Sequence, residues 1–349
     1  MKYRALLYNG PKDLEFAELD MPECGDNDVI LKNRMASICG SDTDTWLNGG
    51  EMHYIPPHVE FGHEVVSEIY AVGKNVKDIK VGDRVAPFPL KVTPNSRKAG
   101  WLGGFSEYIY CTNAAYDYNL WKLDDSISDK EAAMIEPFSV GITTADKAVL
   151  REGATYLILG CGLIGFCVAA RLADKGVPRK NITLIDKSEL RLQKAREQGF
   201  NGVCNAGNDN FWDEVFEYTG KAYSVYGPGS NADYIFECAG SMYPDAKEPT
   251  LMEQAMKVLK YNGTMVVTGV HRQQVNINMQ KLVFGLQNIV YGSGNVEYHF
   301  KEAIRILQSK PFNFETLVTQ VYSFEDAIEA IKFTCDPNKC FRVLISYNS

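Results

Sequence analysis

The sequence has no C-x-x-C pair of cysteines and no excess of basic residues. Its nine cysteines are scattered over 349 residues, a pattern unlike a disulfide framework, which favours reduced thiols in the cytoplasm. The 36 lysines and arginines are outnumbered by 44 aspartates and glutamates, for a formal charge of −8. Because nucleic acids and anionic membranes are recognised by basic surfaces, this balance argues against both as partners.

A long uninterrupted hydrophobic run is also missing. The longest apolar stretch, 156–173, contains Gly160, Gly162 and Gly165, so a strand, a glycine turn and a helix explain it better than a membrane span. The first ten residues alternate in polarity and lack the apolar centre of a secretory signal. We therefore expect a cytoplasmic protein.

The chain is long enough for two domains, and its pattern changes twice. Residues 1–138 consist mostly of short alternating runs, which predict β structure, and end in a helix that begins with the capping box Ser128–Glu131. From about residue 150, apolar runs alternate with helical patterns, which predicts a doubly wound parallel sheet. The elements after 295 are too few for a domain. The predicted α/β organisation is therefore one domain at 1–138 and 295–349, and an inserted one at 139–294.

A glycine motif, GCGLIG at 160–165, follows an apolar strand and opens a helix. Gly160 would form the tight turn, Gly162 would admit a pyrophosphate, and Gly165 would let helix and strand pack closely. Asp186 lies 186 − 165 = 21 residues further on, where a carboxylate binds the ribose hydroxyls of NAD. The alternatives are a purely structural turn and an S-adenosylmethionine site.

The choice between NAD and NADP depends on the charges after this motif. Asp186 repels a 2′-phosphate and favours NAD, whereas Lys187 and Arg191 would favour NADP. The candidate cofactor-binding residues are those of the motif, the end of the next strand and a later strand end: Gly160, Gly162, Leu163, Ile164, Gly165, Asp186, Lys187, Arg191 and Val270.

Three separate segments carry residues that bind metals. They contain Cys39, His63–Glu64 and Glu136, and thiolate, imidazole and carboxylate are the ligands that zinc takes. The separations, 63 − 39 = 24 and 136 − 64 = 72, are unlike a compact zinc finger and suit a catalytic site with an open position. Taken singly, Cys39 could be a small buried apolar residue, His63 a structural residue and Glu136 a charge at a helix end.

At these motifs the sequence resembles the zinc-dependent medium-chain dehydrogenases, especially their sorbitol, glucose and threonine dehydrogenase branch. The resemblance covers nearly the whole chain and rests on these motifs: CGSD at 39–42, GHE at 62–64, VGDRV at 81–85, GGFSEY at 103–108, EPFSVG at 136–141, the glycine motif and GSGN at 292–295. It implies a GroES-like β-rich catalytic domain with one catalytic zinc, and a Rossmann domain that binds NAD or NADP.

The resemblance also implies roles for the metal-binding segments. Cys39 and His63 would bind zinc, and Glu64 would be a ligand or a near-ligand that exchanges with water. Glu136 stands where the polyol branch has a glutamate and simple alcohol dehydrogenases have a cysteine. Which carboxylate, Glu64 or Glu136, binds zinc directly in the resting state is left open.

Further roles follow from the same resemblance. Zinc would lower the pKa of the substrate hydroxyl, and hydride would pass from the carbinol carbon to the nicotinamide. Ser41 would hydrogen-bond the substrate hydroxyl and pass its proton towards the cofactor ribose, and Asp42 would fix the ring of His63 or simply cap a helix. Asn295 matches a position near the nicotinamide, with a turn asparagine as the alternative.

Two departures from the family pattern are informative. The family often holds a second, structural zinc with four cysteines, but residues 86–104 contain none, so one zinc per chain is expected. Where alcohol dehydrogenases often have a histidine that completes the proton relay, this chain has Asp44. Asp44 would accept the proton, contact a sugar hydroxyl or lie on the solvated surface.

Several residues are expected to make the surroundings of the zinc polar, with a purely structural role as the alternative for each: Asp44, Trp46, His53, His58 and Glu107. Because a site that hydrogen-bonds hydroxyls rejects analogues that lack them, we expect a small hydroxylated substrate, namely a polyol, cyclitol or sugar. The alternatives are an amino-alcohol such as threonine, a simple secondary alcohol, a zinc-free quinone or enoyl reductase, and a non-catalytic NAD-binding protein. A homo-oligomer, dimer or tetramer, is expected because the last strands of such nucleotide domains pair across a two-fold axis.

Overall fold

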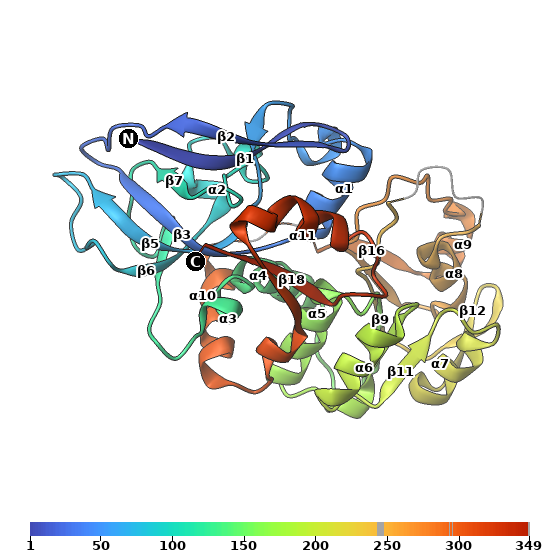
Figure 1. The fold of residues 1–349 in the computed structure, drawn as a ribbon. Helices are drawn as coiled ribbons and strands as arrows, with labels where there is room; N and C mark the ends of the chain where they lie inside the picture. Colours follow the sequence, from blue (N-terminus) through green and yellow to red (C-terminus); the bar gives the residue numbers. More distant parts are fainter. Residues whose placement is uncertain (243–247, 293, 295, 348–349) are drawn as a thin grey trace. The chain divides into compact units, whose positions relative to one another are not determined.

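A computed structural model describes residues 1–242, 248–292, 294 and 296–347. Asn295, one of the candidate cofactor residues, lies outside the described residues. The chain divides into two compact units, the first formed by Met1–Glu136 and Val296–Ser349 and the second by Pro137–Asn295 (Figure 1). Each unit is described by itself.

The first unit is built mainly from antiparallel strands. Its larger sheet has the order β17-β18-β3-β5-β6-β8, with β7 also paired to β3, and its smaller sheet has the order β2-β1-β4. The strands are β1 (Lys2–Gly10), β2 (Asp13–Asp20), β3 (Val29–Ser37), β4 (Val59–Glu60), β5 (Glu64–Val72), β6 (Arg84–Pro87), β7 (Tyr108–Cys111), β8 (Leu120–Lys122), β17 (Val318–Ser323) and β18 (Arg342–Ser346).

Short helices connect these strands. The α-helices are α1 (Gly40–Asn48), α2 (Pro89–Val92), α3 (Asp129–Ala132), α10 (Glu297–Ser309) and α11 (Ala327–Phe333), and the 3-10 helices are η1 (Glu51–His53), η2 (Ser96–Lys98), η4 (Phe314–Leu317) and η5 (Phe324–Asp326). The capping box predicted at the start of α3 is confirmed, with Ser128 and Glu131 bonded to each other's backbone N–H. The helix is shorter than expected, because it ends at Ala132 and a new helix begins at Ile135.

The C-terminal segment shares the hydrophobic core of the first unit. Val29 and Leu31 of β3 and Val343 and Ile345 of β18 are buried in one cluster. β18 pairs antiparallel with β3, with Leu344 opposite Ser37. The red elements β18 and α11 therefore lie beside the blue β3 and α1 in Figure 1.

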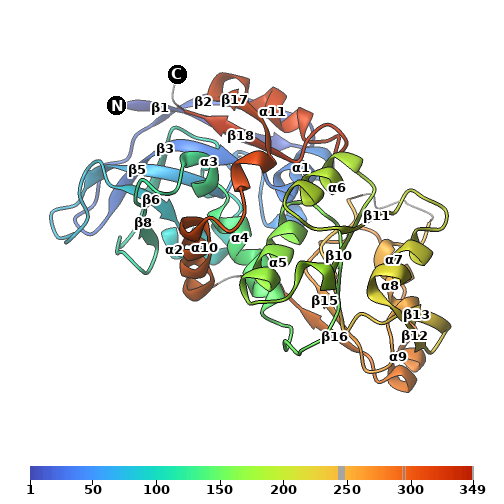
Figure 2. The same ribbon diagram turned by 90° about the horizontal axis from the view of Figure 1, so that it is seen from below.

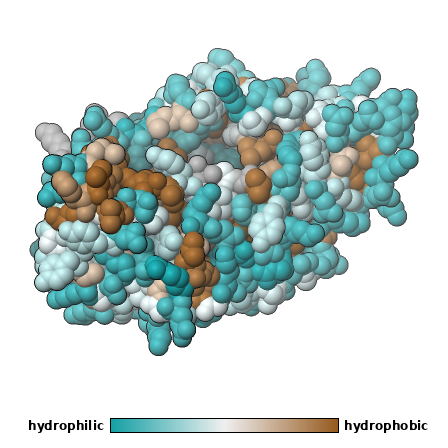
Figure 3. Space-filling model, turned by 180° about the vertical axis from the view of Figure 1, so that it is seen from behind, coloured by the Kyte–Doolittle hydropathy of each residue, from teal (hydrophilic) through white to brown (hydrophobic). Residues whose placement is uncertain are grey.

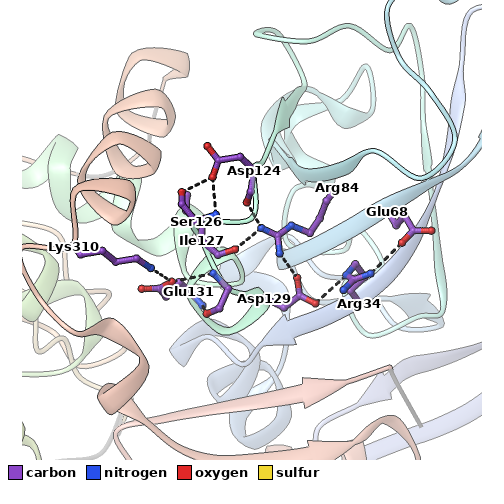
Figure 4. A network of polar contacts seen from close by, with 10 residues as sticks. Arg34, Glu68, Arg84, Asp124, Ser126, Ile127, Asp129, Glu131 and Lys310 are labelled. Atoms are coloured by element: carbon purple, nitrogen blue, oxygen red, sulfur yellow. Dashed lines mark hydrogen bonds and ion pairs between the residues drawn. The ribbon is translucent and has the colours of Figure 1, made fainter.

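A polar network joins the sheet of the first unit to α3 (Figure 4). Asp129 accepts from Arg34 Nε of β3 at 2.9 Å and from Arg84 Nη1 of β6 at 3.1 Å. Arg34 also pairs with Glu68 of β5 at 3.1 Å. The groups are partly exposed, so the network orients α3 more than it stabilises the fold.

The second unit is a doubly wound α/β fold, which confirms the predicted class. Its six strands are all parallel, in the order β11-β10-β9-β14-β15-β16, which is the 3-2-1-4-5-6 order of dinucleotide-binding folds. The strands are β9 (Tyr156–Leu159), β10 (Ile182–Asp186), β11 (Gly202–Asn205), β14 (Tyr234–Glu237), β15 (Thr264–Val267) and β16 (Asn288–Tyr291).

Helices cover both faces of this sheet. They are α4 (Ile135–Ala145, which begins at the end of the first unit), α5 (Leu163–Asp174), the 3-10 helix η3 (Arg179–Asn181), α6 (Glu189–Glu197), α7 (Phe211–Thr219), α8 (Leu251–Val258) and α9 (Met279–Gly285). Figure 2 shows α5 and α6 on one side of the sheet and α7 and α8 on the other. Because both faces of the sheet are covered, all four residues of β9 are buried, and this explains why its sequence is continuously apolar.

A hairpin of β12 (Lys221–Ser224) and β13 (Gly227–Ser230) is an addition that the sequence pattern did not predict. Among the described residues, no helix combines the length and the apolar character needed to cross a membrane.

Candidate metal centre and dinucleotide site

The register of two strands brings the metal-binding residues together. β3 ends at Ser37 and β5 begins at Glu64, and these two residues are direct partners in the antiparallel pair. Cys39 follows β3 and caps α1, while His63 immediately precedes β5. Among the described residues, the ligand atoms of Cys39, His63 and Glu64 all lie within 4.8 Å of one another.

The glycine of the GHE motif permits this geometry. Gly62 has a φ of +89°, and a Cβ there would lie 2.8 Å from the ring of Phe105. Its N–H donates to the carbonyl of Gly100 at 3.1 Å, and its own carbonyl accepts from the N–H of Gly104 at 2.9 Å. The backbone before His63 is thus held on both sides.

Asp42 links the cap of α1 to the histidine. Its Oδ2 accepts from the N–H of Cys39 at 2.9 Å, and its Oδ1 lies 3.8 Å from Nδ1 of His63. The expected cap of α1 is therefore present, whereas the expected hydrogen bond that fixes the His63 ring is not formed at this distance and stays a prediction. Burial raises the pKa of Asp42, although His63 and the N–H of Cys39 oppose the rise.

Arg342 is absent from the residues predicted above, yet it contacts this group. It lies on β18, is buried, forms an ion pair with Oε2 of Glu64 and donates to the carbonyl of Ile38 at 2.7 Å. Burial lowers the pKa of Arg342 to about 10, with the charges of Cys39 and Asp42 opposing the fall. Its only sequence signal is a lone cation in the mainly apolar segment FRVLIS.

The donor set fits zinc. Several buried side-chain atoms have no hydrogen-bond partner among the described residues, and three of them lie in this group: Oδ1 of Asp42, Nδ1 of His63 and Oε1 of Glu64. Unpaired polar atoms of this kind cost free energy, which a bound cation at the thiol, imidazole and carboxylate would offset. Burial and Asp42 raise the pKa of the Cys39 thiol, whereas Arg342 and the hydrogen bonds from Ser41 lower it.

Glu136 is not part of this group. It lies in the first turn of α4, is partly buried, and is not among the three side chains whose ligand atoms converge. The structure therefore gathers Cys39, His63 and Glu64, and Glu136 stays a predicted ligand.

Asp44 is buried, so its expected alternative as a solvated surface residue is wrong. Its side chain is 4% exposed, its Oδ2 lies 2.7 Å from Nε2 of His53, and its Oδ1 accepts from Nδ2 of Asn48 at 2.8 Å. Residue 44 is buried because this part of α1 is enclosed on all sides: Asp42 to Trp46, more than one full helical turn, are all buried.

The other polar candidates have local structural contacts. Trp46 belongs to the hydrophobic core, and the Glu107 carboxylate accepts from the N–H of Arg4 at 2.7 Å. Nδ1 of His58 lies 3.0 Å from Oδ1 of Asn9 in an exposed position. Of these polar candidates, His53 is the one that contacts Asp44.

The glycine motif of the second unit has the expected geometry. Gly160 has a φ of +89°, and a Cβ there would lie 2.8 Å from the backbone of Ala239. A Cβ on Gly165 would overlap the carbonyl oxygen of Gly160. Gly162 caps α5, and a Cβ there would meet only the side chain of Arg191, at 3.6 Å. Two glycines are thus required by packing, while the third leaves the helix N-terminus open.

Asp186 lies next to this turn. It ends β10 and accepts from the N–H groups of Cys161 and Ser188, both at 2.8 Å. Nη1 of Arg191 is 3.8 Å from its Oδ2, and Lys187 is exposed. Val270 follows β15 and is half exposed. The carboxylate that favours NAD is therefore placed at the turn, with Arg191 beside it.

Comparisons with known proteins cover both units. Residues 25–124 match the family described as alcohol dehydrogenase GroES-like domain, and residues 164–309 match the family described as zinc-binding dehydrogenase. The chain is 30% identical to sorbitol dehydrogenase of Rattus norvegicus over 96% of both chains. It is 28% identical to D-xylulose reductase of Saccharomyces cerevisiae over 95% of this chain and 93% of that protein.

Solved structures share the fold along the whole chain. The 2R,3R-butanediol dehydrogenase of Bacillus subtilis superposes with a TM-score of 0.80 at 24% identity, covering 99% of this chain and 100% of that one. An alcohol dehydrogenase of E. coli CFT073 in complex with NADH has a TM-score of 0.80 at 25% identity and covers 99% of both chains.

The chain belongs to the zinc-dependent medium-chain dehydrogenases, in which a GroES-like domain is combined with a Rossmann domain. It is therefore an oxidoreductase that uses zinc and NAD(P). Within this family it is similar to the sorbitol dehydrogenases. The expected family and cofactors are thus confirmed.

Proposed function

We propose that the protein oxidises a secondary or hemiacetal hydroxyl of a polyol, cyclitol or sugar with NAD as hydride acceptor. The observation that carries this proposal is the convergence of Cys39, His63 and Glu64, with buried unpartnered atoms, in a relative of sorbitol dehydrogenase. An amino-alcohol such as threonine and a simple secondary alcohol are the alternative substrates.

Cys39, His63 and Glu64 would hold the zinc, and Glu136 remains a second candidate for the carboxylate ligand. When bound, zinc supplies Lewis-acid polarisation of the substrate oxygen and so favours the alkoxide near neutral pH. Asp42, whose Oδ1 lies 3.8 Å from Nδ1 of His63, would fix the His63 ring and increase its basicity once the two atoms approach to hydrogen-bond distance.

Ser41 and Asp44 would accept and transfer the proton of the substrate hydroxyl. They lie one turn apart on α1. Ser41 would hydrogen-bond the substrate hydroxyl and relay its proton, and NAD, when bound, would supply the acceptor for the hydride of the carbinol carbon. Asp44 is the next acceptor on this helix, and His53, 2.7 Å from Asp44, shares the proton with it.

The second unit would bind the dinucleotide. Gly162, Leu163 and Ile164 present the N-terminus of α5 to the pyrophosphate, and Asp186 binds the ribose hydroxyls. Arg191 beside Asp186 keeps NADP as an alternative. Lys187, Val270 and Asn295 complete the proposed cofactor set.

We further propose a homo-oligomer built on a dimer through the edge of the second unit. β16 is the edge strand of the described sheet, and an unpaired edge is a site for strand pairing. Large apolar side chains of α9 and the turn after it are exposed, and Figure 3 shows a brown patch over this part of the chain: Met279, Val283, Phe284 and Leu286.

The nine free cysteines support a reducing compartment, for which we propose the cytoplasm.

The experiment is NAD reduction over a panel of polyols, sugars, cyclitols and amino-alcohols, with zinc measured on the same sample. We expect one zinc per chain and the highest kcat/KM on a polyol, cyclitol or sugar. The substrate class is wrong if ethanol or butanol exceeds every polyol, and threonine as the best substrate would favour the amino-alcohol alternative.

A further inference from the structure

The first unit contains a pocket of about 430 Å³ outside the metal group. Its walls come from two segments, 51–57 and 95–101. The residues that carry the argument are Glu51, Tyr54, Ile55, Pro56, Arg97 and Trp101. Nothing in the metal centre or the dinucleotide site uses these side chains.

Both walls are connected to the candidate active site. Trp101 forms an isolated bridge with Gly62, and the N–H of Gly62 donates to Gly100, so this wall is bonded to the residue before His63. The other wall continues from η1, where His53 lies beside Asp44. A Cβ on Gly100 would lie 3.2 Å from the carbonyl of His53, so the two walls also pack against each other.

The segment 95–101 belongs to the stretch without cysteines. The family often has a lobe with a structural zinc at this place. In this chain, residues 86–104 comprise the last residues of β6, the helices α2 and η2, and the loop that contains Trp101. The stretch without cysteines therefore supplies a wall of the pocket.

The pocket combines two aromatic rings with two charged groups. Tyr54 is exposed and has a φ of +56°, an uncommon conformation for a bulky residue that is typical of functional sites. The Arg97 guanidinium lies 5.7 Å from the Tyr54 ring centroid. Within the described chain neither the Glu51 carboxylate nor the Arg97 guanidinium has an ion-pair partner, so both remain able to bind a ligand.

We propose that this pocket is a subsite for a sugar ring carried by the substrate. Aromatic faces cover the C–H face of such a ring, and ring hydroxyls can both accept from Arg97 and donate to Glu51. Two groups of opposite charge, neither with an ion-pair partner among the described residues, match the mixed donors and acceptors of hydroxyls better than they match an anion or a purely apolar ligand. The proposal rests on the proposed oxidation, and it makes the substrate a polyol or sugar bearing a ring rather than a short open chain.

The test compares two substrates that differ by one ring, sorbitol and its glucosyl derivative maltitol. The zinc-loaded wild-type enzyme is expected to have the higher kcat/KM on maltitol. Trp101→Ala should lower the maltitol-to-sorbitol ratio of kcat/KM about tenfold, mainly through KM, and Trp101→Phe should restore most of it because it keeps an aromatic face. Tyr223→Ala, at a strongly exposed tyrosine of β12, is the matched control and should leave the ratio unchanged.

A second readout does not depend on turnover. Binding of methyl α-glucoside to the zinc-loaded, full-length protein is followed by isothermal titration calorimetry, and Trp101→Ala should abolish the saturable binding heat. Equal ratios in wild type and Trp101→Ala, with no glucoside signal, would overturn the subsite while leaving the proposed function standing. Glucoside binding that depends on Trp101, without oxidation of any hydroxylated compound, would support the subsite and overturn the proposed function.

Discussion

The metal centre and the glycine turn reach their geometry in opposite ways. The metal group joins residues distant in sequence and leaves buried polar atoms unpartnered. The glycine turn is local, and its key positions are set by the absence of side chains, since a Cβ on Gly160 or Gly165 would meet backbone. We therefore expect the metal centre to lose its function when a ligand group is removed. We expect the glycine turn to lose stability or cofactor binding when a side-chain atom is added.

The largest effect is expected from Cys39→Ser. Loss of the thiolate removes the zinc, and with it several kcal/mol of transition-state stabilisation, so kcat should fall by roughly 10³-fold or more. Zinc content and turnover are measured on one sample. Cys335→Ser, at another partly buried thiol, should keep both. Full turnover of a metal-free Cys39→Ser enzyme would refute the zinc mechanism.

Arg342→Leu tests the charge behind the metal group. Without the guanidinium, Glu64 is left as a buried, unpaired carboxylate, and the free energy of unfolding of the metal-free protein should fall by about 3–5 kcal/mol. Zinc should reduce this loss because it replaces the missing positive charge. Urea unfolding with and without the metal measures the loss in both states. Arg305→Leu, which removes an exposed pair with Glu302, should cost less than about 1 kcal/mol in either state. An equal loss with and without zinc would show that Arg342 acts independently of the metal.

Gly165→Ala and Gly162→Ala separate packing from binding in the second unit. The added methyl group at 165 should destabilise the protein by about 1–3 kcal/mol, whereas at 162 it meets only the Arg191 side chain and should leave the melting temperature nearly unchanged. Gly162→Ala should instead weaken NADH binding, measured by fluorescence titration. Neither variant should change the zinc content. A large fall in the melting temperature of Gly162→Ala would contradict the distinction.

The smallest effect is expected from Asp186→Asn. Removing the negative charge should raise the NADP-to-NAD ratio of kcat/KM about tenfold, equivalent to ~1.4 kcal/mol. Asp209→Asn, at an exposed aspartate of the same unit, serves as the control. A wild-type enzyme that already prefers NADP would show that Arg191 outweighs Asp186.

Much of this architecture could be predicted from local patterns. The alternation of apolar runs and helices predicts the doubly wound sheet. The motifs predict Cys39, His63, Glu64 and Glu136 as metal ligands, and the first three of these converge in the structure. Local patterns do not predict long-range pairing, and so Arg342, 278 positions after Glu64, was not anticipated. The burial of Asp44 was missed for a related reason: a short polar helix appears solvated until the elements that cover it are known.

The position of Arg342 has a consequence for the order of events during synthesis. Cys39, His63 and Glu64 leave the ribosome early, but the guanidinium that pairs with Glu64 belongs to a strand made 278 residues later. Until that strand pairs with β3, the carboxylate has no such counter-charge. The native metal centre, in which Arg342 is paired with Glu64, is therefore completed only after β18 has been translated and has paired with β3.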